Sequence, residues 1–251
     1  MELPKEYFQD SEKIWRAINI RLPESKEIKG TIAFLFGGYK EEPKGMNKIV
    51  AGSKGVNTIG RAPNSNEIKV IEQLVERKWR VLLFDDMQYA TPDGTVHNEM
   101  WIEDYMKWIN SRFGKEKKEK IFMAGFSSGA YIVGLHLQHL AIHASTESAS
   151  AYGIFSYPID VGHIKKKSKF ETGNFDGRPT LFLSGSSTKD VASNPPNVNG
   201  YKNTKAIYDI ASKGTSTKHK WQDLDTSHRI FEDYESVIEM VDEWFNQFIE
   251  K

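Results

Sequence analysis

The pattern with the clearest chemical meaning is Gly-Phe-Ser-Ser-Gly at residues 125–129, which matches G-x-S-x-G. It follows an unbroken apolar run and precedes a mostly apolar stretch at residues 130–143. A strand, a tight turn and a helix in this order present the central serine as a nucleophile. Glycines on either side let the neighbouring backbone approach closely. Ser127 is therefore the candidate nucleophile, with Gly125 and Gly129 shaping the turn.

A serine hydroxyl needs a base, and the base needs an acid to orient it. His228 lies after the last strand candidate and before the last helix candidate, so it is the candidate base. Asp190 lies between Ser127 and His228 and follows another strand candidate, which favours it as the acid. Asp160, after the preceding strand, is its rival. Asp225 is too close to His228 in sequence to reach the imidazole from behind.

An attacking serine also needs donors for the oxyanion that develops on the substrate. The backbone N–H of Ser128 opens the predicted helix after Ser127 and is one candidate. A Gly37-Gly38-Tyr39 turn after an apolar run is the other, and we expect Gly38 and Tyr39 to supply that donor. The ring of Tyr39 would also line the acyl or leaving-group pocket.

The elements that must position these residues alternate along the chain. Short apolar runs typical of buried strands lie at 31–36, 81–84, 121–124 and 180–183, and further strand candidates lie at 15–22, 151–157 and 218–224. Helix candidates lie at 67–77, 101–108, 201–212 and 232–248, and a stretch that is apolar on most sides, as a buried helix would be, lies at 130–143. This alternation predicts an α/β fold with a mostly parallel sheet flanked by helices.

Long irregular stretches follow the strand candidates, and they place the candidate site. They run over residues 37–66, 85–98, 157–178 and 184–200, whereas connections into the strands are mostly shorter. Open α/β sheets bind ligands beyond the carboxyl ends of their strands. We therefore expect one domain over residues 1–251, with residues 37–66 forming a long loop over the site.

Composition excludes several classes of protein. The 251 residues hold 34 Lys plus Arg, 34 Asp plus Glu and no Cys. The absence of Cys excludes disulfide scaffolds, iron–sulfur clusters and a thiol nucleophile. Zero net charge argues against nucleic acid as a partner. No apolar run approaches the roughly 18 residues of a membrane span. Residues 1–6 lack signal-peptide character, so we expect a cytoplasmic protein, with a secreted mature form as the alternative.

Taken together, these motifs resemble the α/β-hydrolase superfamily, from about Trp15 to the C-terminus. Within it, the chain is most similar to compact, lidless serine esterases related to dienelactone hydrolases. The resemblance implies a sheet of about eight strands, no separate lid domain, a Ser127-His228-Asp190 triad and no cofactor or metal. The stretch at residues 157–178 is too short and too polar for a helical lid.

The chain departs from its relatives at three points. Dienelactone hydrolases proper use Cys, which is absent here. Phe36 and Tyr39 stand where hormone-sensitive-lipase-like esterases have the first and last residues of His-Gly-Gly-Gly. The spacing from Gly185 to Asp190 is two residues longer than the common G-x-x-D.

Three further patterns offer other functions. The spacing of a P-loop occurs at residues 55–60, but Arg-Ala follows where phosphate binding needs Lys-Ser/Thr. Histidines at positions 136, 139 and 143 share one helical face. They could bind zinc, and the alternative is that they are buried or helix-end histidines. Lysines at positions 165–167 and 169 would attract an anionic substrate if they line the site, and otherwise form a solvated loop.

The sequence thus predicts a serine hydrolase that cleaves small-molecule carboxylic esters through an acyl-enzyme. The same residues would also serve a thioesterase, lactonase, peptidase or acyltransferase, because fold and triad do not fix the substrate. A small-molecule receptor on the same fold is the alternative from another class. The oligomeric state is left open by the sequence.

Overall fold

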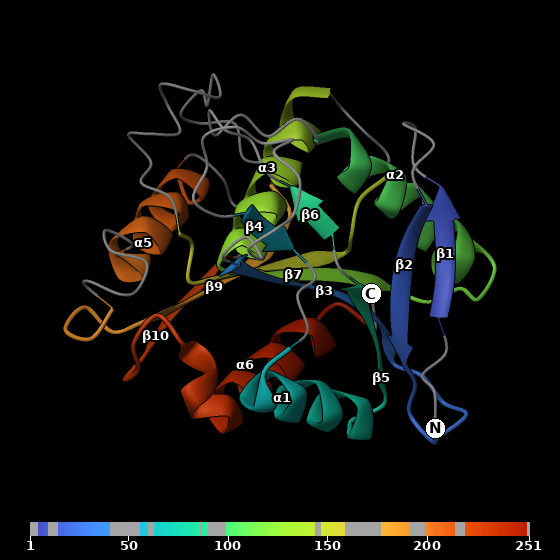
Figure 1. Cartoon of the computed structure of the whole chain (residues 1–251), viewed down its shortest axis with the longest axis horizontal. Coiled ribbons are helices and arrows are strands. Elements are labelled where there is room, and N and C mark those ends of the chain that lie inside the picture. The colour runs from blue at the N-terminus through green and yellow to red at the C-terminus, as the bar shows by residue number, and fades with distance from the viewer. Residues whose placement is uncertain are drawn as a thin grey trace, which may run out of the picture.

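A central β-sheet organises the molecule (Figure 1). The computed structural model describes residues 5–9, 15–40, 56–59, 63–85, 87–89, 99–143, 147–158, 177–190, 199–213 and 219–249. The main path of the sheet has the strand order β1-β2-β5-β3-β7-β8-β9-β10. The strands on this path are β1 (Lys5–Gln9), β2 (Trp15–Arg21), β3 (Gly30–Lys40), β5 (Trp79–Asp85), β7 (Ile121–Phe126), β8 (Ala151–Phe155), β9 (Thr180–Gly185) and β10 (Lys220–Leu224).

The six strands from β5 to β10 along this path are parallel, whereas β1 and β2 pair antiparallel at one side. Every residue of β7, β8 and β9 is buried. Continuous apolar runs are typical of strands covered on both faces. The structure confirms the predicted fold class, a mostly parallel sheet of eight strands flanked by helices.

Helices cover both faces of the sheet (Figure 1). On one face lie α1 (Ser65–Glu76) and α6 (Tyr234–Asn246), and on the other lie α2 (Glu99–Ile109), α3 (Ser128–His143) and α5 (Gly200–Ala211). A π-helical turn, η1 (Asn110–Lys115), continues α2, and a 3-10 turn, η2 (Ile230–Asp233), leads into α6. Two apolar clusters fill the space between the sheet and its two helical layers.

Local sequence explains where α1 begins and why α3 is deeply buried. The side chain of Asn64 accepts from the N–H of Glu67, and the Glu67 carboxylate accepts from the N–H of Asn64. This reciprocal capping box fixes the start of α1. In α3, residues 129–137 are all buried, as its apolar composition on most sides predicts.

The loop predicted for residues 37–66 is wrong in part. β3 continues through Gly37 and Gly38 to Lys40 and pairs antiparallel with β4 (Val56–Ile59). β4 in turn pairs with β6 (Met87–Tyr89). The Val, Thr and Ile of β4 favour extended backbone, and a partner strand can support two glycines that propensity alone would place in a turn. The P-loop-like spacing at residues 55–60 therefore contains a strand.

Among the described residues, no helix combines the length and the apolar character that crossing a membrane would require.

Candidate active site

The candidate nucleophile lies at a sharp turn between β7 and α3. Ser127 has a φ of 54°, in the left-handed region that costs energy for a residue with a side chain. Its N–H donates to the carbonyl of Phe155 in β8 at 3.0 Å, and its own carbonyl accepts from the N–H of Tyr131 in α3 at 3.1 Å. Strained backbone held by surrounding structure is typical of functional sites.

Two glycines make this turn sterically feasible. A Cβ on Gly125 would overlap the carbonyl of Gly129, and a Cβ on Gly129 would overlap the carbonyl of Leu35 in β3. The start of α3 therefore packs backbone against backbone on both β7 and β3. This close approach is the physical reason why the turn needs glycine at positions 125 and 129.

The candidate base faces the serine. Nε2 of His228 lies 3.1 Å from Oγ of Ser127, within hydrogen-bond distance, although the two residues are 101 positions apart. The side chain of His228 is 9% exposed, and its ring lies 5.5 Å from that of Phe126, centroid to centroid. Phe126 in turn contacts Phe231 edge to face at 4.8 Å. An aromatic wall thus limits the orientations that the imidazole can take.

The candidate acid lies on the other side of the imidazole. Asp190 is fully buried, and its Oδ1 is 3.7 Å from Nδ1 of His228. This separation exceeds a hydrogen bond by about half an ångström. Among the described residues, neither Nδ1 of His228 nor Oδ2 of Asp190 has a hydrogen-bond partner. Catalytic hydrogen bonds are often long without substrate and tighten when it binds.

The two loops that bear the acid and the base are bonded to each other. The N–H of Ser186 donates to the carbonyl of Thr226 at 3.0 Å. Nζ of Lys189 donates to the carboxylate of Asp225 at 2.8 Å. A Cβ on Gly185 would overlap the carbonyl of Ser227. Asp190 and His228 therefore belong to one structural unit at the ends of β9 and β10.

The rival acids have different positions. Asp225 is exposed and paired with Lys189, so its carboxylate does not face His228. Asp160 lies outside the described residues, as do Lys165–Lys167 and Lys169. The prediction of an anionic substrate from those lysines is therefore not tested.

The predicted oxyanion turn is wrong in conformation, because Gly37, Gly38 and Tyr39 continue β3 as a strand. The last registered pair of β3 and β7 is Phe36 with Phe126, and the two strands lead directly to Gly37 and to Ser127. Ser128 is the first residue of α3, where backbone N–H groups lack intrahelical acceptors. The role of Ser128, Gly38 and Tyr39 as oxyanion donors stays a prediction.

The histidines on α3, which the sequence offers as candidate zinc ligands, have the following environments. Among the described residues, no three His, Asp or Glu side chains are grouped so that they could hold one. His139 pairs with Glu103 of α2. Burial, together with His139 and Arg178, lowers the pKa of His136 from its usual 6.5 to about 3, so this imidazole is neutral. The side chain of His143 lies outside the described part of the chain.

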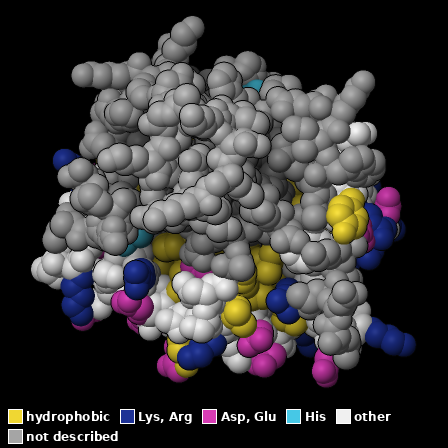
Figure 2. Space-filling view, in the orientation of Figure 1, with side chains coloured by type: hydrophobic (Ala, Val, Ile, Leu, Met, Phe, Trp, Pro, Cys, Tyr) yellow, Lys and Arg dark blue, Asp and Glu magenta, His cyan; other side chains and the backbone are white. Residues whose placement is uncertain are grey.

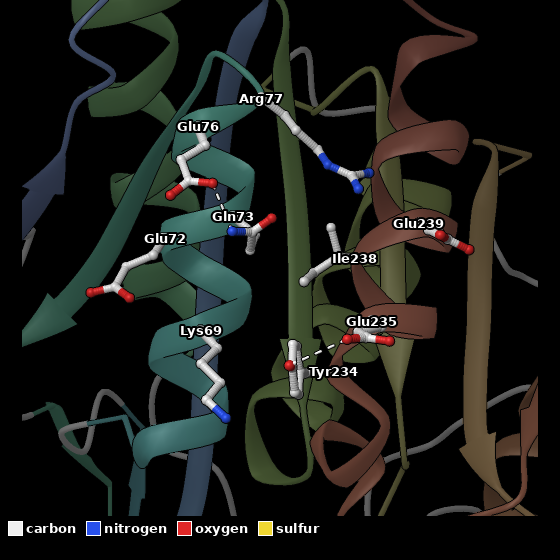
Figure 3. A pocket seen from close by; sticks show the side chains of 9 residues that line it. All are labelled: Lys69, Glu72, Gln73, Glu76, Arg77, Tyr234, Glu235, Ile238 and Glu239. Atoms are coloured by element: carbon white, nitrogen blue, oxygen red, sulfur yellow. Dashed lines mark hydrogen bonds between the residues drawn. The ribbon is translucent and has the colours of Figure 1, made fainter.

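A hollow of about 440 Å³ lies between α1 and α6 (Figure 3). It is lined by Lys69, Glu72, Gln73, Glu76, Arg77, Tyr234, Glu235, Ile238 and Glu239. The surface over these helices mixes basic and acidic side chains with apolar ones (Figure 2). Some polar groups that line the hollow pair with one another, for example Gln73 with Glu76. The hollow contains none of the residues around Ser127.

Comparison with known proteins defines the fold. The sequence matches no family model and no curated protein. An esterase from Pyrococcus furiosus is similar in structure, with a TM-score of 0.66 and 14% identity over 99% of this chain and 92% of that one. A lidless α/β serine hydrolase from Xanthomonas campestris gives 0.58 and 13%, over 98% and 95%. Dienelactone hydrolase from Anabaena variabilis gives 0.57 and 16%, over 99% of each chain.

The chain therefore has the α/β-hydrolase fold that its motifs predict. The structures it matches include esterases and a dienelactone hydrolase, the relatives that those motifs indicate. At this level of identity the likeness extends to the fold and not to the substrate.

Sequence reasoning missed one residue at the site. Gly200, the first residue of α5, lies against both Asp190 and His228. The available signal was the Asn-Gly pair at positions 199 and 200, which marks a turn and a helix start but gives no reason to place that turn next to the acid.

Proposed function

We propose that the protein is a serine hydrolase that cleaves carboxylic esters of small molecules. The observation that carries the proposal is the 3.1 Å approach of His228 Nε2 to Ser127 Oγ at a strained turn, with buried Asp190 beyond the imidazole. A nucleophile, a base within hydrogen-bond reach and an acid behind it are the groups that acyl transfer needs. The esterases of the same fold support this assignment.

In the proposed reaction, Oγ of Ser127 attacks the ester carbonyl carbon while Nε2 of His228 takes its proton. The negative charge on the carbonyl oxygen is stabilised by the N–H of Ser128 and by a second donor from residues 37–39 of β3. One such donor is worth about 3–4 kcal/mol of transition-state stabilisation. The imidazolium then gives its proton to the leaving alkoxide, and an alcohol departs.

Water completes the cycle at the same groups. His228 takes a proton from water, the hydroxide attacks the acyl-enzyme, and the returning proton restores Oγ of Ser127 as the carboxylic acid leaves. Asp190 accepts from Nδ1 of His228, which fixes the tautomer and stabilises the imidazolium. The net reaction consumes one ester and one water and yields one acid and one alcohol.

Labelling and turnover test this proposal. The protein is incubated with a fluorophosphonate and with p-nitrophenyl esters, a thioester and a lactone, and Ser127→Ala is the control. We expect labelling of the wild type alone, and ester hydrolysis that falls by about 10⁵-fold in the variant. Absence of both labelling and turnover above the Ser127→Ala background would reject a hydrolase and favour a receptor.

A second comparison tests the acid. We expect Asp190→Asn to lower kcat by about 10⁴-fold, because an asparagine at this position favours the wrong tautomer of the histidine. Asp160→Asn should leave kcat within about two-fold. A large loss in Asp160→Asn with an active Asp190→Asn would transfer the role to Asp160.

A further inference from the structure

Gly200 lies beside the gap between the candidate acid and base. A Cβ built on Gly200 would overlap Oδ2 of Asp190 and come within 2.8 Å of Nδ1 of His228. Both of these atoms are buried and lack a hydrogen-bond partner among the described residues. A side chain on Gly200 would therefore occupy the space between the carboxylate of Asp190 and the imidazole of His228.

The backbone of Gly200 also contacts the acid. Its N–H donates to Oδ1 of Asp190 at 3.3 Å. Gly200 opens α5, where N–H groups have no intrahelical acceptor and the helix dipole favours a negative charge. The acid is therefore held by the first turn of a helix, and the glycine brings that turn to within hydrogen-bond distance of the carboxylate.

The helix itself is fixed against the sheet, so it can act as a support. Oγ1 of Thr204 accepts from the N–H of Tyr157 at 2.7 Å, just after the end of β8. Oδ1 of Asn199 accepts from the N–H of Lys202 at 2.8 Å and caps the helix. Thr204 and Ile207 are fully buried. A displacement at Gly200 therefore moves Asp190 more readily than it moves α5.

We propose that Gly200 is a positioning residue that acts through Asp190: it orients the carboxylate with its N–H and, having no side chain, leaves room for Asp190 and His228 to close to hydrogen-bond distance. This inference rests on the proposed hydrolase function. A methyl group at this position would hold the carboxylate away from the imidazole while leaving Ser127 in place.

A double-mutant cycle tests the inference. We expect Gly200→Ala to lower kcat by about 100-fold, the size of effect that a misplacement of about 1 Å produces, with KM within about three-fold of wild type. Asp190→Ala alone should lower kcat by about 10⁴-fold. Adding Gly200→Ala to Asp190→Ala should then cost less than about three-fold, because the group through which glycine acts is already gone.

Gly114→Ala is the matched control. Gly114 lies in η1, and a Cβ there would have its nearest neighbours at 3.6 Å or beyond, in ordinary contact. We expect its kcat to be within about two-fold of wild type. If Gly200→Ala does not fold, the Gly200→Ala/Asp190→Ala double variant should recover folding, measured by circular dichroism, because the overlapping carboxylate has been removed.

The outcomes separate this inference from the proposed function. Wild-type turnover that depends on Ser127, together with full activity in Gly200→Ala, would overturn the inference alone. Losses that multiply in the double variant, or a double variant that stays unfolded, would also overturn it, since Gly200 would then act independently of Asp190. No turnover that depends on Ser127 would reject the hydrolase and the inference with it.

Discussion

The two edges of the sheet, where the parallel strands begin and where they end, differ in how many hydrogen bonds their carboxylates accept. At the edge where the parallel strands begin, the carboxylate of Glu119 accepts from Nη1 of Arg80 at 2.6 and 2.5 Å and from Oγ1 of Thr31 at 2.5 Å. Asp242 of α6 similarly accepts from the indole N–H of Trp79 at 2.7 Å and from Lys29 at 3.2 Å. These carboxylates have several donors each and tie loops and helices to the sheet.

At the edge where the strands end, groups are left unmatched. Oδ2 of Asp190, Nδ1 of His228 and Oγ of Ser156 are buried without a hydrogen-bond partner among the described residues. Ser127 and Ser156 both have positive φ there, at 54° and 48°, but left-handed backbone also occurs at the opposite edge, at Lys78 before β5 and at Lys118 before β7. The difference therefore lies in the partners of the carboxylates: Glu119 and Asp242 each have several donors, whereas Oδ2 of Asp190 has no hydrogen-bond partner among the described residues. We expect substitutions at the first edge to change stability and substitutions at the second to change activity.

The largest expected effect is on catalysis at the carboxyl-terminal edge. We expect His228→Ala to lower kcat by about 10⁵-fold, because Oγ of Ser127 loses its base. The free energy of unfolding should change by less than about 2 kcal/mol, since His228 contributes one 3.1 Å hydrogen bond to the fold. Ester hydrolysis and urea denaturation measure the two quantities. A variant that keeps a tenth of wild-type activity would contradict the assignment.

The amino-terminal edge should show the reverse. We expect Glu119→Ala to lower the free energy of unfolding by about 3 kcal/mol, because Arg80, which is 3% exposed, would be left buried without its counter-ion. The kcat should stay within about two-fold of wild type. Asp225→Ala removes an exposed ion pair to Lys189 and is the control, with a cost below about 1 kcal/mol. Equal costs for the two variants would remove the distinction between the edges.

His136 tests whether a buried polar group outside the site affects stability without affecting catalysis, since its ring nitrogens have no hydrogen-bond partner among the described residues. Its folded-state pKa of about 3 lies below the usual 6.5 because of burial. Above pH 6.5 the imidazole is neutral in both states. As the pH falls toward 3, the unfolded chain binds a proton that the folded one does not, so stability falls by about 1.4 kcal/mol per pH unit.

Between pH 6.5 and 5, this linkage costs about 2 kcal/mol. We expect His136→Leu to lose that part of the pH dependence while its kcat at pH 7.5 stays within about three-fold of wild type. Urea denaturation at a series of pH values measures it. Identical slopes of stability against pH in the two proteins would show that His136 is not the titrating group.

The smallest effect concerns strain next to the nucleophile. We expect Ser156→Gly to raise the free energy of unfolding by about 1 kcal/mol, because glycine adopts a φ of 48° without steric cost. The substitution also removes a buried hydroxyl that has no partner among the described residues. A stability below that of wild type in thermal or urea denaturation would mean that the left-handed backbone at the end of β8 is not strained.

The sequence was sufficient for the parts of the fold that local pattern determines. Apolar runs predicted β7 and β9, and a stretch that is apolar on most sides predicted α3, because burial on all sides leaves a continuous hydrophobic signature. The positions of Ser127, Asp190 and His228 followed from their places after strands. Their approach within one site depends on the strand order, which parallel α/β topology makes regular.

What the sequence could not provide depends on pairing between distant segments. Gly37 and Gly38 resemble a turn locally, and only pairing with residues 56–59 extends β3 through them. β1 was missed because Lys-Glu-Tyr-Phe-Gln has little apolar character and forms a strand by pairing with β2. Gly200 became visible as a site residue only when the start of α5 was placed against Asp190.

The place of β10 in the strand order bears on how activity is lost during denaturation. His228 lies in the loop that follows this strand. Within the described sheet, β10 pairs with β9 alone, and it is only partly buried along most of its length. Segments with few neighbours exchange their amide hydrogens through local opening, at a lower free energy than global unfolding. Because the loop before Asp190 is bonded to the loop before His228, opening at this border releases base and acid together. Denaturant should thus abolish turnover while the centre of the sheet, around β7 and β8, still protects its amides.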